Sequence, residues 1–194
     1  GPTINESNVN AALIEGNDSY VNKTSGANQT KRFAVNVFDI ETNSYVYNAN
    51  LSFWVTNDSN NYRLDTVNKT DAFGNSSYYF NPDCSYNVGK QNWKAGVTDG
   101  CYLDINATAT NFTTIVIGDL TLTFNKPAGE KYLRGDNITL NASVVETNCS
   151  LYINDSNVNF SVSKSQTVNY CNPVNIEGSG YYDCTFNTSG YTSQ

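Results

Sequence analysis

Residues 137–144 have the sequence Asn-Ile-Thr-Leu-Asn-Ala-Ser-Val, and this alternation of polar and apolar residues predicts a β-strand. Side chains of a strand point alternately to its two faces, so the four apolar residues would face a core while Asn137 and Asn141 face solvent. Both asparagines also begin the motif Asn-x-Ser/Thr, the acceptor for N-glycosylation. The stretch therefore predicts a half-buried β-sheet whose outer face can carry glycans.

The acceptor motif recurs along the whole chain. The sequence has 31 asparagines among 194 residues, and with its content of serine and threonine chance placement would give roughly six motifs. Sixteen are present, none with proline in the middle position. They begin at Asn5, Asn17, Asn22, Asn28, Asn50, Asn57, Asn68, Asn75, Asn106, Asn111, Asn137, Asn141, Asn148, Asn154, Asn159 and Asn187. Turn chemistry does not explain acceptors on the outer faces of strands, so we expect most of them to carry covalent N-glycans.

The five cysteines indicate an oxidising, extracellular compartment. Cys171 and Cys184 are equally distant from Glu177 and Gly178, which favour a hairpin turn. Neighbouring strands of a hairpin bring their Cβ atoms close enough for a bridge. We therefore predict a Cys171–Cys184 disulfide.

The remaining cysteines leave two pairings open. A Cys84–Cys101 bridge would close a short loop around Trp93, which requires residues 85–91 to fold back. A Cys84–Cys149 bridge would instead link two parts of the chain. Either pairing leaves one thiol whose partner lies outside this segment. The sequence has no histidine and no Cys-x-x-Cys motif, so we expect no metal site and no cofactor.

The charge composition argues against several classes of function. Eleven basic against eighteen acidic side chains give a net charge of −7, and the basic residues are scattered, unlike those of a nucleic-acid binder. The absence of histidine removes the usual catalytic base, so we predict that the protein is not an enzyme. No run of 18 apolar residues is present, so no transmembrane segment is predicted. The expected location is extracellular or on a cell surface.

An internal repeat sets the number of domains. Residues 37–39 align with residues 144–146, and the same offset continues without a gap. It aligns Val46 with Ile153, Ala49 with Ser156, Leu51 with Val158, Phe53 with Phe160 and Val55 with Val162. A second block, whose offset is shorter by one residue, aligns Gly74 with Gly180, Phe80 with Phe186 and Asn81 with Asn187. Such self-similarity is typical of tandem domains, and we place the two units at residues 1–118 and 119–194.

Within each unit, apolar residues alternate in short runs separated by Asn, Gly, Asp and Ser, and no stretch keeps a helical period. This pattern predicts an all-β fold of two tandem immunoglobulin-like antiparallel β-sandwiches. In the first unit, strands are expected near 11–15, 32–40, 46–55, 77–80, 92–98 and 110–117, after an N-terminal extension of residues 1–10. In the second unit, they are expected near 120–124, 137–145, 153–162, 166–170 and 181–187.

Two groups of residues resemble a known family. The first group consists of Asp39, Val46, Ala49, Leu51 and Phe53. It resembles a strand pair of bacterial and archaeal immunoglobulin-like repeats. The second, residues 132–140 and 180–184, is similar to repeats of large archaeal extracellular glycoproteins, including thread- or stalk-like filaments. The resemblance implies stalks, surface layers, threads or adhesins, and it implies no catalytic residues.

The second unit is expected to be incomplete within this segment. Counterparts of the strands at 92–98 and 110–117 would fall beyond residue 194. Their absence would leave apolar side chains under-covered at Leu122, Leu140, Phe160 and Phe186. The missing strands would come from continuation of the polypeptide, or from a neighbouring subunit that donates Gly1–Asn10. Both routes predict a head-to-tail polymer of this chain with itself.

These observations favour a structural subunit or repeat of a heavily N-glycosylated extracellular filament, stalk or surface layer. The alternative is an adhesin or viral ectodomain that binds a host surface or a carbohydrate. Trp54 falls on the outward phase of its strand, where it could contact a sugar or a partner. Residues 134–136 form the integrin-type tripeptide Arg-Gly-Asp, which we interpret as an ordinary turn before a strand.

Overall fold

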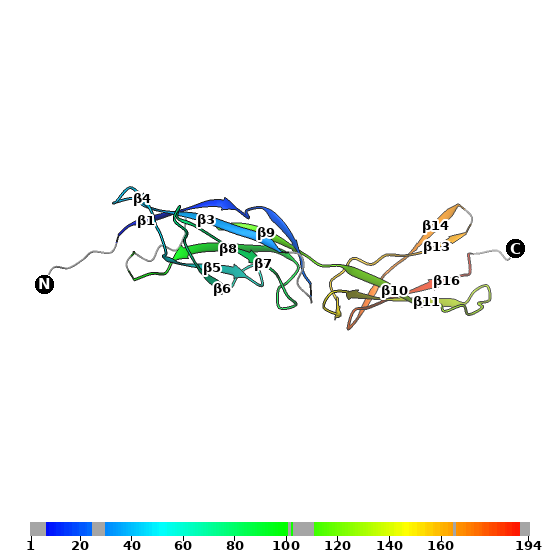
Figure 1. The fold of residues 1–194 in the computed structure, drawn as a ribbon. Coiled ribbons are helices and arrows are strands. Elements are labelled where there is room, and N and C mark those ends of the chain that lie inside the picture. The colour runs from blue at the N-terminus through cyan, green and yellow to red at the C-terminus, as the bar shows by residue number, and fades with distance from the viewer. Residues whose placement is uncertain (1–6, 25–29, 101, 103–110, 165, 191–194) are drawn as a thin grey trace. The chain divides into compact units, whose positions relative to one another are not determined.

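The computed structural model describes residues 7–24, 30–100, 102, 111–164 and 166–190, and these residues contain sixteen strands and no helix (Figure 1). The chain divides into two compact units, Gly1–Gly118 and Asp119–Gln194, here unit 1 and unit 2. This boundary lies where the sequence repeat places it. The all-β fold class predicted from the alternating pattern is confirmed.

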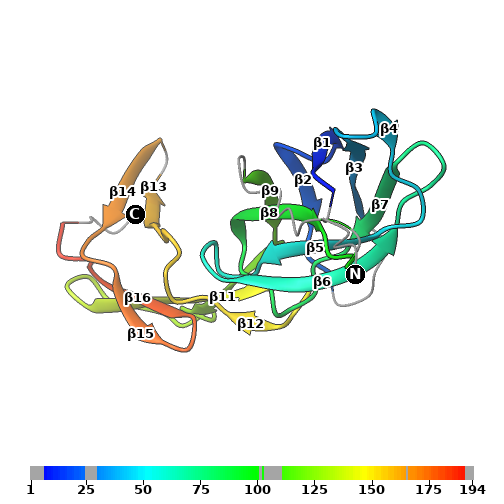
Figure 2. The same ribbon diagram turned by 90° about the vertical axis from the view of Figure 1, so that its left-hand side faces the viewer.

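Unit 1 is a sandwich of two sheets (Figures 1 and 2). One sheet has the order β1-β3-β4, with β7 also pairing with β3, and the other has the order β2-β9-β8-β5-β6. The pairs are antiparallel except for β2 and β9, which run parallel. The strands are β1 Val9–Glu15, β2 Ser19–Asn22, β3 Lys31–Asp39, β4 Ser44–Tyr45, β5 Asn50–Thr56, β6 Tyr62–Lys69, β7 Asn75–Phe80, β8 Gly89–Val97 and β9 Phe112–Ile117.

Gly16 lets the chain pass from one sheet of unit 1 to the other between β1 and β2. Its φ of +108° is a conformation that L side chains rarely adopt. A Cβ added here would lie 2.6 Å from Cδ1 of Phe33, so no side chain fits. The carbonyl of Gly16 also accepts a hydrogen bond from Nε1 of the buried Trp93 at 3.1 Å. The crossing is therefore fixed by glycine geometry and by a core tryptophan.

Aromatic rings form the centre of the unit 1 core. Phe33 on β3 stacks on Trp93 of β8, with ring centroids 4.3 Å apart and planes within 6°. Phe80 of β7 lies on Phe33 at 5.1 Å. All three side chains are fully buried. Because Phe33 and Trp93 come from different sheets, their stack joins the two layers of the sandwich.

Unit 2 has one larger sheet and a separate hairpin. The sheet has the order β10-β11-β16-β15, with β12 also pairing with β11, and the hairpin is β13-β14. In both ribbon views the hairpin diverges from β11 and β16. The strands are β10 Leu120–Lys126, β11 Asn137–Glu146, β12 Leu151–Tyr152, β13 Phe160–Lys164, β14 Thr167–Cys171, β15 Asn175–Gly178 and β16 Tyr181–Asn187.

The core of unit 2 is small but closed at its centre. It consists of Leu140, Ala142, Val144, Phe160, Cys171, Tyr182, Cys184 and Phe186. The expectation that Leu140, Phe160 and Phe186 would be under-covered is wrong, since they are only 4%, 5% and 8% exposed. Phe160 and Cys171 face each other across the hairpin and cover the middle of the larger sheet.

The duplication is visible in matching backbone contacts. In unit 1 the N–H of Val37 donates to the carbonyl of Gly74 at 2.8 Å, and in unit 2 the N–H of Val144 donates to that of Gly180 at 2.9 Å. The two glycines have φ angles of +71° and +72°. A Cβ would lie 2.2 Å from the oxygen of Val37 at the first glycine and 2.7 Å from that of Val144 at the second. Both units therefore need glycine at the aligned position.

Asp39 and Glu146 are a second matched pair. Each is buried at the end of the strand that carries it. Oδ1 of Asp39 accepts the backbone N–H groups two and three residues ahead, at 2.9 and 3.0 Å. The carboxylate of Glu146 accepts the corresponding N–H groups at 3.2 and 3.0 Å. The acidic residue closes the turn after β3 in unit 1 and after β11 in unit 2.

Several strand boundaries differ from the sequence prediction. Strands β2, β4, β6, β12 and β15 were not predicted. Four of them have only two or four residues. In β6 the apolar residues Leu64 and Val67 are three positions apart, so they do not alternate. The strand expected at 153–162 begins only at Phe160, because the preceding residues form a loop in which Asn154 Oδ1 accepts the N–H of Gly180 at 2.6 Å.

The N-terminal extension is shorter than predicted. Val9 and Asn10 begin β1, where they pair with Asp39 and Phe38 of β3. Val9 is 1% exposed and belongs to the unit 1 core. Residues 9 and 10 therefore belong to their own unit and are not free to be donated, which corrects the donor segment Gly1–Asn10. Residues 1–6 lie outside the described part of the chain.

Candidate functional site: a glycosylation surface

The acceptor asparagines lie at the surface of both units. Of the sixteen, Asn5, Asn28 and Asn106 fall outside the described residues. The other thirteen are all described and none of them is buried. Six are exposed: Asn17, Asn111, Asn137, Asn154, Asn159 and Asn187. Seven are partly exposed: Asn22, Asn50, Asn57, Asn68, Asn75, Asn141 and Asn148.

Two acceptors form a cross-strand pair on the outer face of unit 2. Asn137 on β11 lies opposite Asn187 on β16, and Nδ2 of Asn187 donates to Oδ1 of Asn137 at 2.8 Å. Further along β11, Oδ1 of Asn141 accepts from Nδ2 of Asn125 at 3.1 Å. Asn137 and Asn141 thus lie on the outer face of the strand, as their alternation with apolar residues predicts.

In unit 1 the acceptor Asn75 begins β7 with its amide held in place. Its Oδ1 accepts from Nδ2 of Asn36, the opposite residue on β3, at 2.9 Å. Its backbone N–H donates to Oδ1 of Asp71 at 2.8 Å. The side chain therefore stands on the outer face of the sheet in a defined orientation, directly after the tight turn that ends at Gly74.

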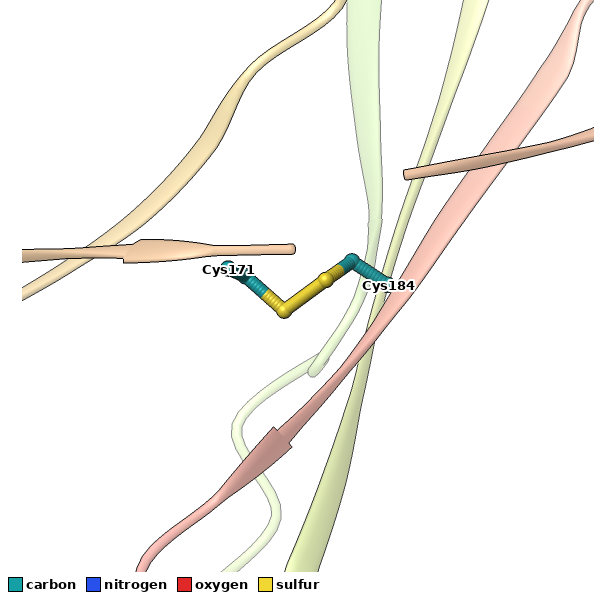
Figure 3. Close-up of a disulfide and its surroundings, with 2 residues drawn as sticks. All are labelled: Cys171 and Cys184. Carbon is teal, nitrogen blue, oxygen red and sulfur yellow. A yellow bond between two sulfur atoms is a disulfide. The ribbon is translucent and has the colours of Figure 1, made fainter. Parts of the chain in front are cut away.

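The structure contains the predicted Cys171–Cys184 disulfide (Figure 3), with Cα atoms 6.1 Å apart. The predicted geometry was wrong, because the two cysteines are not on neighbouring strands of one hairpin. Cys171 ends β14 and pairs with Phe160, whereas Cys184 lies on β16 and pairs with Leu140. The bridge therefore joins the β13-β14 hairpin to the larger sheet across the core.

Cys101, which the sequence offers as a partner of Cys84, lies outside the described residues. The choice between the Cys84–Cys101 and Cys84–Cys149 pairings stays a prediction.

Trp54 lies on the outer face of unit 1 beside a cation. Nζ of Lys94, on the adjacent strand β8, lies 5.4 Å from the Trp54 ring centroid and 4.7 Å from that of Tyr62 on β6. A lysine near two aromatic rings is held by their electron-rich faces. Leu64 and Val67 of β6 are exposed. The cluster gives this face an apolar, cationic patch, with the acceptor Asn50 on the same face of β5.

The Arg134-Gly135-Asp136 tripeptide forms a turn before β11. Oδ2 of Asp136 accepts the N–H of Leu133 at 2.6 Å, and the N–H of Gly135 donates to Oγ1 of Thr188 at 2.9 Å. Gly135 has a φ of +95°. The carboxylate thus takes part in the turn itself, in line with the interpretation of this tripeptide as turn chemistry.

The inner face of β10 is an open apolar surface, called the β10 face below and formed by Leu120, Leu122 and Phe124. Leu122 lies opposite Val144 and Phe124 opposite Ala142, so these side chains point to the same face as the buried core of β11. They are nevertheless 60%, 58% and 52% exposed in chain order. The ring of Phe124 contacts that of Phe160, with centroids 6.4 Å apart. Large apolar side chains gathered at a surface are typical of an interaction site.

Carboxylates that accept backbone N–H groups hold the turns of unit 1. The backbone N–H of Asn61, followed by its side chain, lowers the pKa of Asp58 to about 2. Backbone N–H groups three and four residues ahead are the main causes that lower the pKa of Asp39 and of Asp71. Charge-assisted bonds of this kind stabilise the ionised form. Within the described residues, no three His, Cys, Asp or Glu side chains gather as a metal site.

No family model matches the sequence, and no curated protein matches it. Three solved structures are similar to this chain. One is an invasin described as a bacterial integrin-binding protein, with 15% sequence identity and a TM-score of 0.44. The others are a tetra-tandem repeat in the extending region of a large adhesion protein, with 15% identity and a TM-score of 0.46, and FdeC, an Escherichia coli adhesin, with 10% identity and a TM-score of 0.40. The matches cover 93%, 91% and 97% of this chain but only 34%, 40% and 58% of the other chains. The chain thus spans from about a third to about three fifths of their length. At these levels the similarity assigns neither a family nor a function. In the part of the chain that the structure describes, no helix is long and apolar enough to cross a membrane.

Proposed function

We propose that this chain is a glycan-coated structural repeat of an extracellular filament, stalk or surface layer. The observation that carries the proposal is the placement of the acceptors: none of the thirteen described is buried, and they occur on both units. Glycans on these asparagines would cover the outer faces and blunt the sheet edges, which otherwise invite aggregation. A disulfide across the unit 2 core fits the same extracellular setting.

We also propose that neighbouring units join head-to-tail through the β10 face. Unit 1 supplies the reason, because there the counterpart strand β1 packs against β8. A strand of the β8 kind from a neighbouring unit, in the same polypeptide or in another copy, would cover Leu120, Leu122 and Phe124. Because about half of each side chain is already covered, burying the rest contributes roughly 1 kcal/mol for each of the three. Since Val9 and Asn10 belong to β1, a donor from the N-terminus could include only the residues before them.

The second candidate function is an adhesin or viral ectodomain that binds a host surface or a carbohydrate. The cluster of Trp54, Tyr62 and Lys94 on the outer face of unit 1 favours it, because an aromatic ring beside a cation can hold a sugar face or an anionic group. The acceptor Asn50 on the same face weighs against it, since a glycan there would compete for the patch.

Two measurements on material from the natural source test the first proposal. Intact mass before and after glycan removal should show a glycosylated mass well above 21.3 kDa. Electron microscopy of the native assembly should show continuous filaments or a lattice. A native mass near 21.3 kDa, or dispersed single particles, would contradict the glycan coat or the head-to-tail joining respectively. Binding to a glycan array that Trp54→Ala abolishes would support the adhesin instead.

A further inference from the structure

Each unit has a tyrosine at the same aligned position beside its glycine turn. Tyr152 of β12 occupies in unit 2 the position that Tyr45 of β4 occupies in unit 1, by the same offset that aligns Val37 with Val144. Both tyrosines are about half exposed, at 52% and 53%. Both lie against the turn glycine of their unit, Gly74 or Gly180: a Cβ on Gly180 would lie 2.9 Å from Cδ1 of Tyr152. The equivalent distance at the glycine beside Tyr45 is 3.3 Å.

In unit 2 this tyrosine stacks with a second ring, although about half of it stays exposed. Tyr181, directly after Gly180, stacks on Tyr152 with centroids 5.8 Å apart and planes at 22°. On β11 their partners are Ser143 and Val145, two residues apart and therefore on one face of the sheet. The two stacked rings therefore lie together on the outer face of the sheet, beside the turn at Gly180.

In unit 1 the residue at the position of Tyr181 is the acceptor Asn75. It pairs with Asn36, and Tyr45 pairs with Phe38, so Asn75 and Tyr45 again share one face with the same two-residue spacing on β3. Phe38 contacts the Tyr45 ring edge-on, with centroids 5.5 Å apart and planes at 82°. The Tyr45 ring is thus oriented by a neighbour while no other ring of the described residues stacks on its outer side.

We propose that the first pyranose ring of an N-glycan on Asn75 lies on the Tyr45 ring, in the place that the Tyr181 ring takes on Tyr152. The inference rests on the glycosylation proposed above and names a binding site for the glycan on its own protein. A pyranose has a face of C–H groups, which an electron-rich aromatic face attracts. The amide of Asn75 is held by Asn36 and by the turn residue Asp71, so the sugar starts from a defined point.

The arrangement gives the exposed ring of Tyr45 a partner. Phe73, two residues before the acceptor, is 67% exposed, and its carbonyl accepts Nδ2 of Asn36 at 2.7 Å. The backbone of Phe73 thus helps to fix Asn36, which in turn holds the amide of the acceptor Asn75. A double-mutant cycle measures the contact, because it isolates the energy that the sugar and the ring share.

The chain is produced in a secretory host as wild type, Tyr45→Ala, Asn75→Gln and the double variant, and glycopeptide mass spectrometry establishes whether Asn75 is occupied. Loss of the glycan by Asn75→Gln is expected to lower the melting temperature of unit 1 by about 2 to 6 °C when Tyr45 is present. With alanine at position 45 the same change should have almost no effect. Tyr79→Ala is the matched control, because Tyr79 is an exposed tyrosine on the outer face of β7, four residues from Asn75. Its effect should not depend on the glycan.

A second variant tests the ring without any sugar. In protein made without glycosylation, Asn75→Tyr copies unit 2 and should raise the melting temperature above that of Asn75→Gln only when Tyr45 is present.

The outcomes separate the two proposals. An occupied Asn75 whose glycan stabilises the wild type and Tyr45→Ala equally overturns the stacking site and leaves the glycan coat intact. An empty Asn75 among occupied acceptors also overturns the site. A chain without glycans at any acceptor overturns the proposed coat, and in that case a stabilising Asn75→Tyr would still support the ring platform.

Discussion

β1 of unit 1 and β10 of unit 2 are counterparts in different surroundings. Val9 lies opposite Asp39 and Leu120 opposite Glu146, the aligned acidic residue. Both pairings shift register near their ends, after Leu13 in β1 and after Phe124 in β10. Yet Val9 is 1% exposed and Leu120 is 60% exposed. β1 packs against β8, whereas the described residues of unit 2 include no counterpart of β8. The contrast is confined to the start of the strand, because Leu13 further along β1 is itself 38% exposed. At that start, burial depends on the sheet that faces the strand.

The two cores also hold their sheets together by different means. In unit 1, the stack of Phe33 on Trp93 joins the layers. In unit 2, the second layer is a two-stranded hairpin, and the Cys171–Cys184 bridge ties it to the larger sheet. A small core that buries little apolar surface is where a covalent link contributes most. The contrast leads to predictions of opposite sensitivity in the two units.

The largest effect is expected from Phe33→Ala in unit 1. Removing a fully buried ring should lower the free energy of unfolding of unit 1 by about 3 to 5 kcal/mol. Phe124→Ala, on the open β10 face, should cost unit 2 about 1 kcal/mol or less, since half of that ring is already exposed. Both tryptophans are in unit 1, so their fluorescence in urea reports that unit, and backbone NMR reports unit 2. Equal losses would show that the two faces are equally covered.

Replacing both Cys171 and Cys184 by alanine should selectively destabilise unit 2. The bridge closes a loop with a sequence separation of 13, and loss of such a link costs about 3 kcal/mol. Unit 2 should then unfold at lower urea concentration while the tryptophan transition of unit 1 stays in place. A shift of both transitions would mean that the disulfide does not act on unit 2 alone.

The glycine turn that both units share should make them equally sensitive to substitution at this glycine. Gly74→Ala and Gly180→Ala should each cost about 2 kcal/mol, because a positive φ strains alanine and the new Cβ meets a carbonyl oxygen. Gly129→Ala is the control, since Gly129 also has a positive φ but nothing within 4 Å of an added Cβ, and it should cost only about 1 kcal/mol. If only one of the two substitutions lowered stability, the turns at Gly74 and Gly180 would not be equivalent.

The smallest expected effect is a pH dependence of unit 1. Hydrogen bonds to backbone N–H groups depress the folded-state pKa of Asp39, Asp58 and Asp71 below the ordinary value. A depressed pKa stabilises the fold above the unfolded-state value of about 4, and this contribution is lost as pH falls towards about 2. The urea midpoint of the tryptophan transition should therefore fall between pH 4 and pH 2. Asp58→Asn should reduce that fall, and an unchanged slope would contradict the role of this carboxylate.

The sequence predicts the parts of this fold that depend on local alternation. Residues 137–144 form the strand that their pattern indicates, and their acceptors lie on its outer face. The parallel pairing of β2 with β9 could not be predicted, because it depends on the crossing at Gly16 and on a partner far along the chain. The cover over Phe160 was missed for the same reason, since the hairpin partner strand and the disulfide act across sheets.

The candidate site was also predictable only in part. The acceptor motifs are visible in the sequence, and strand phase predicts which of them face outward. The ring beside Asn75 is not visible, because Tyr45 reaches it through β4 and a glycine turn that only the fold brings together. The repeat offset is the one signal that could have found it, since it aligns Asn75 with Tyr181 and Tyr45 with Tyr152.

Hydrogen exchange of β1 and β10 in the same monomeric sample tests the central claim most directly. Both are edge strands with one hydrogen-bonded neighbour, so a difference in amide protection reports the sheet that faces each of them. We predict that the hydrogen-bonded amides at the covered start of β1, from Val9 to Ala11, are strongly protected. Those of Leu120–Lys126 should exchange much faster in the monomer and become protected in the native assembly. Equal protection of the two strands in the monomer would contradict an open β10 face and the head-to-tail joining proposed from it.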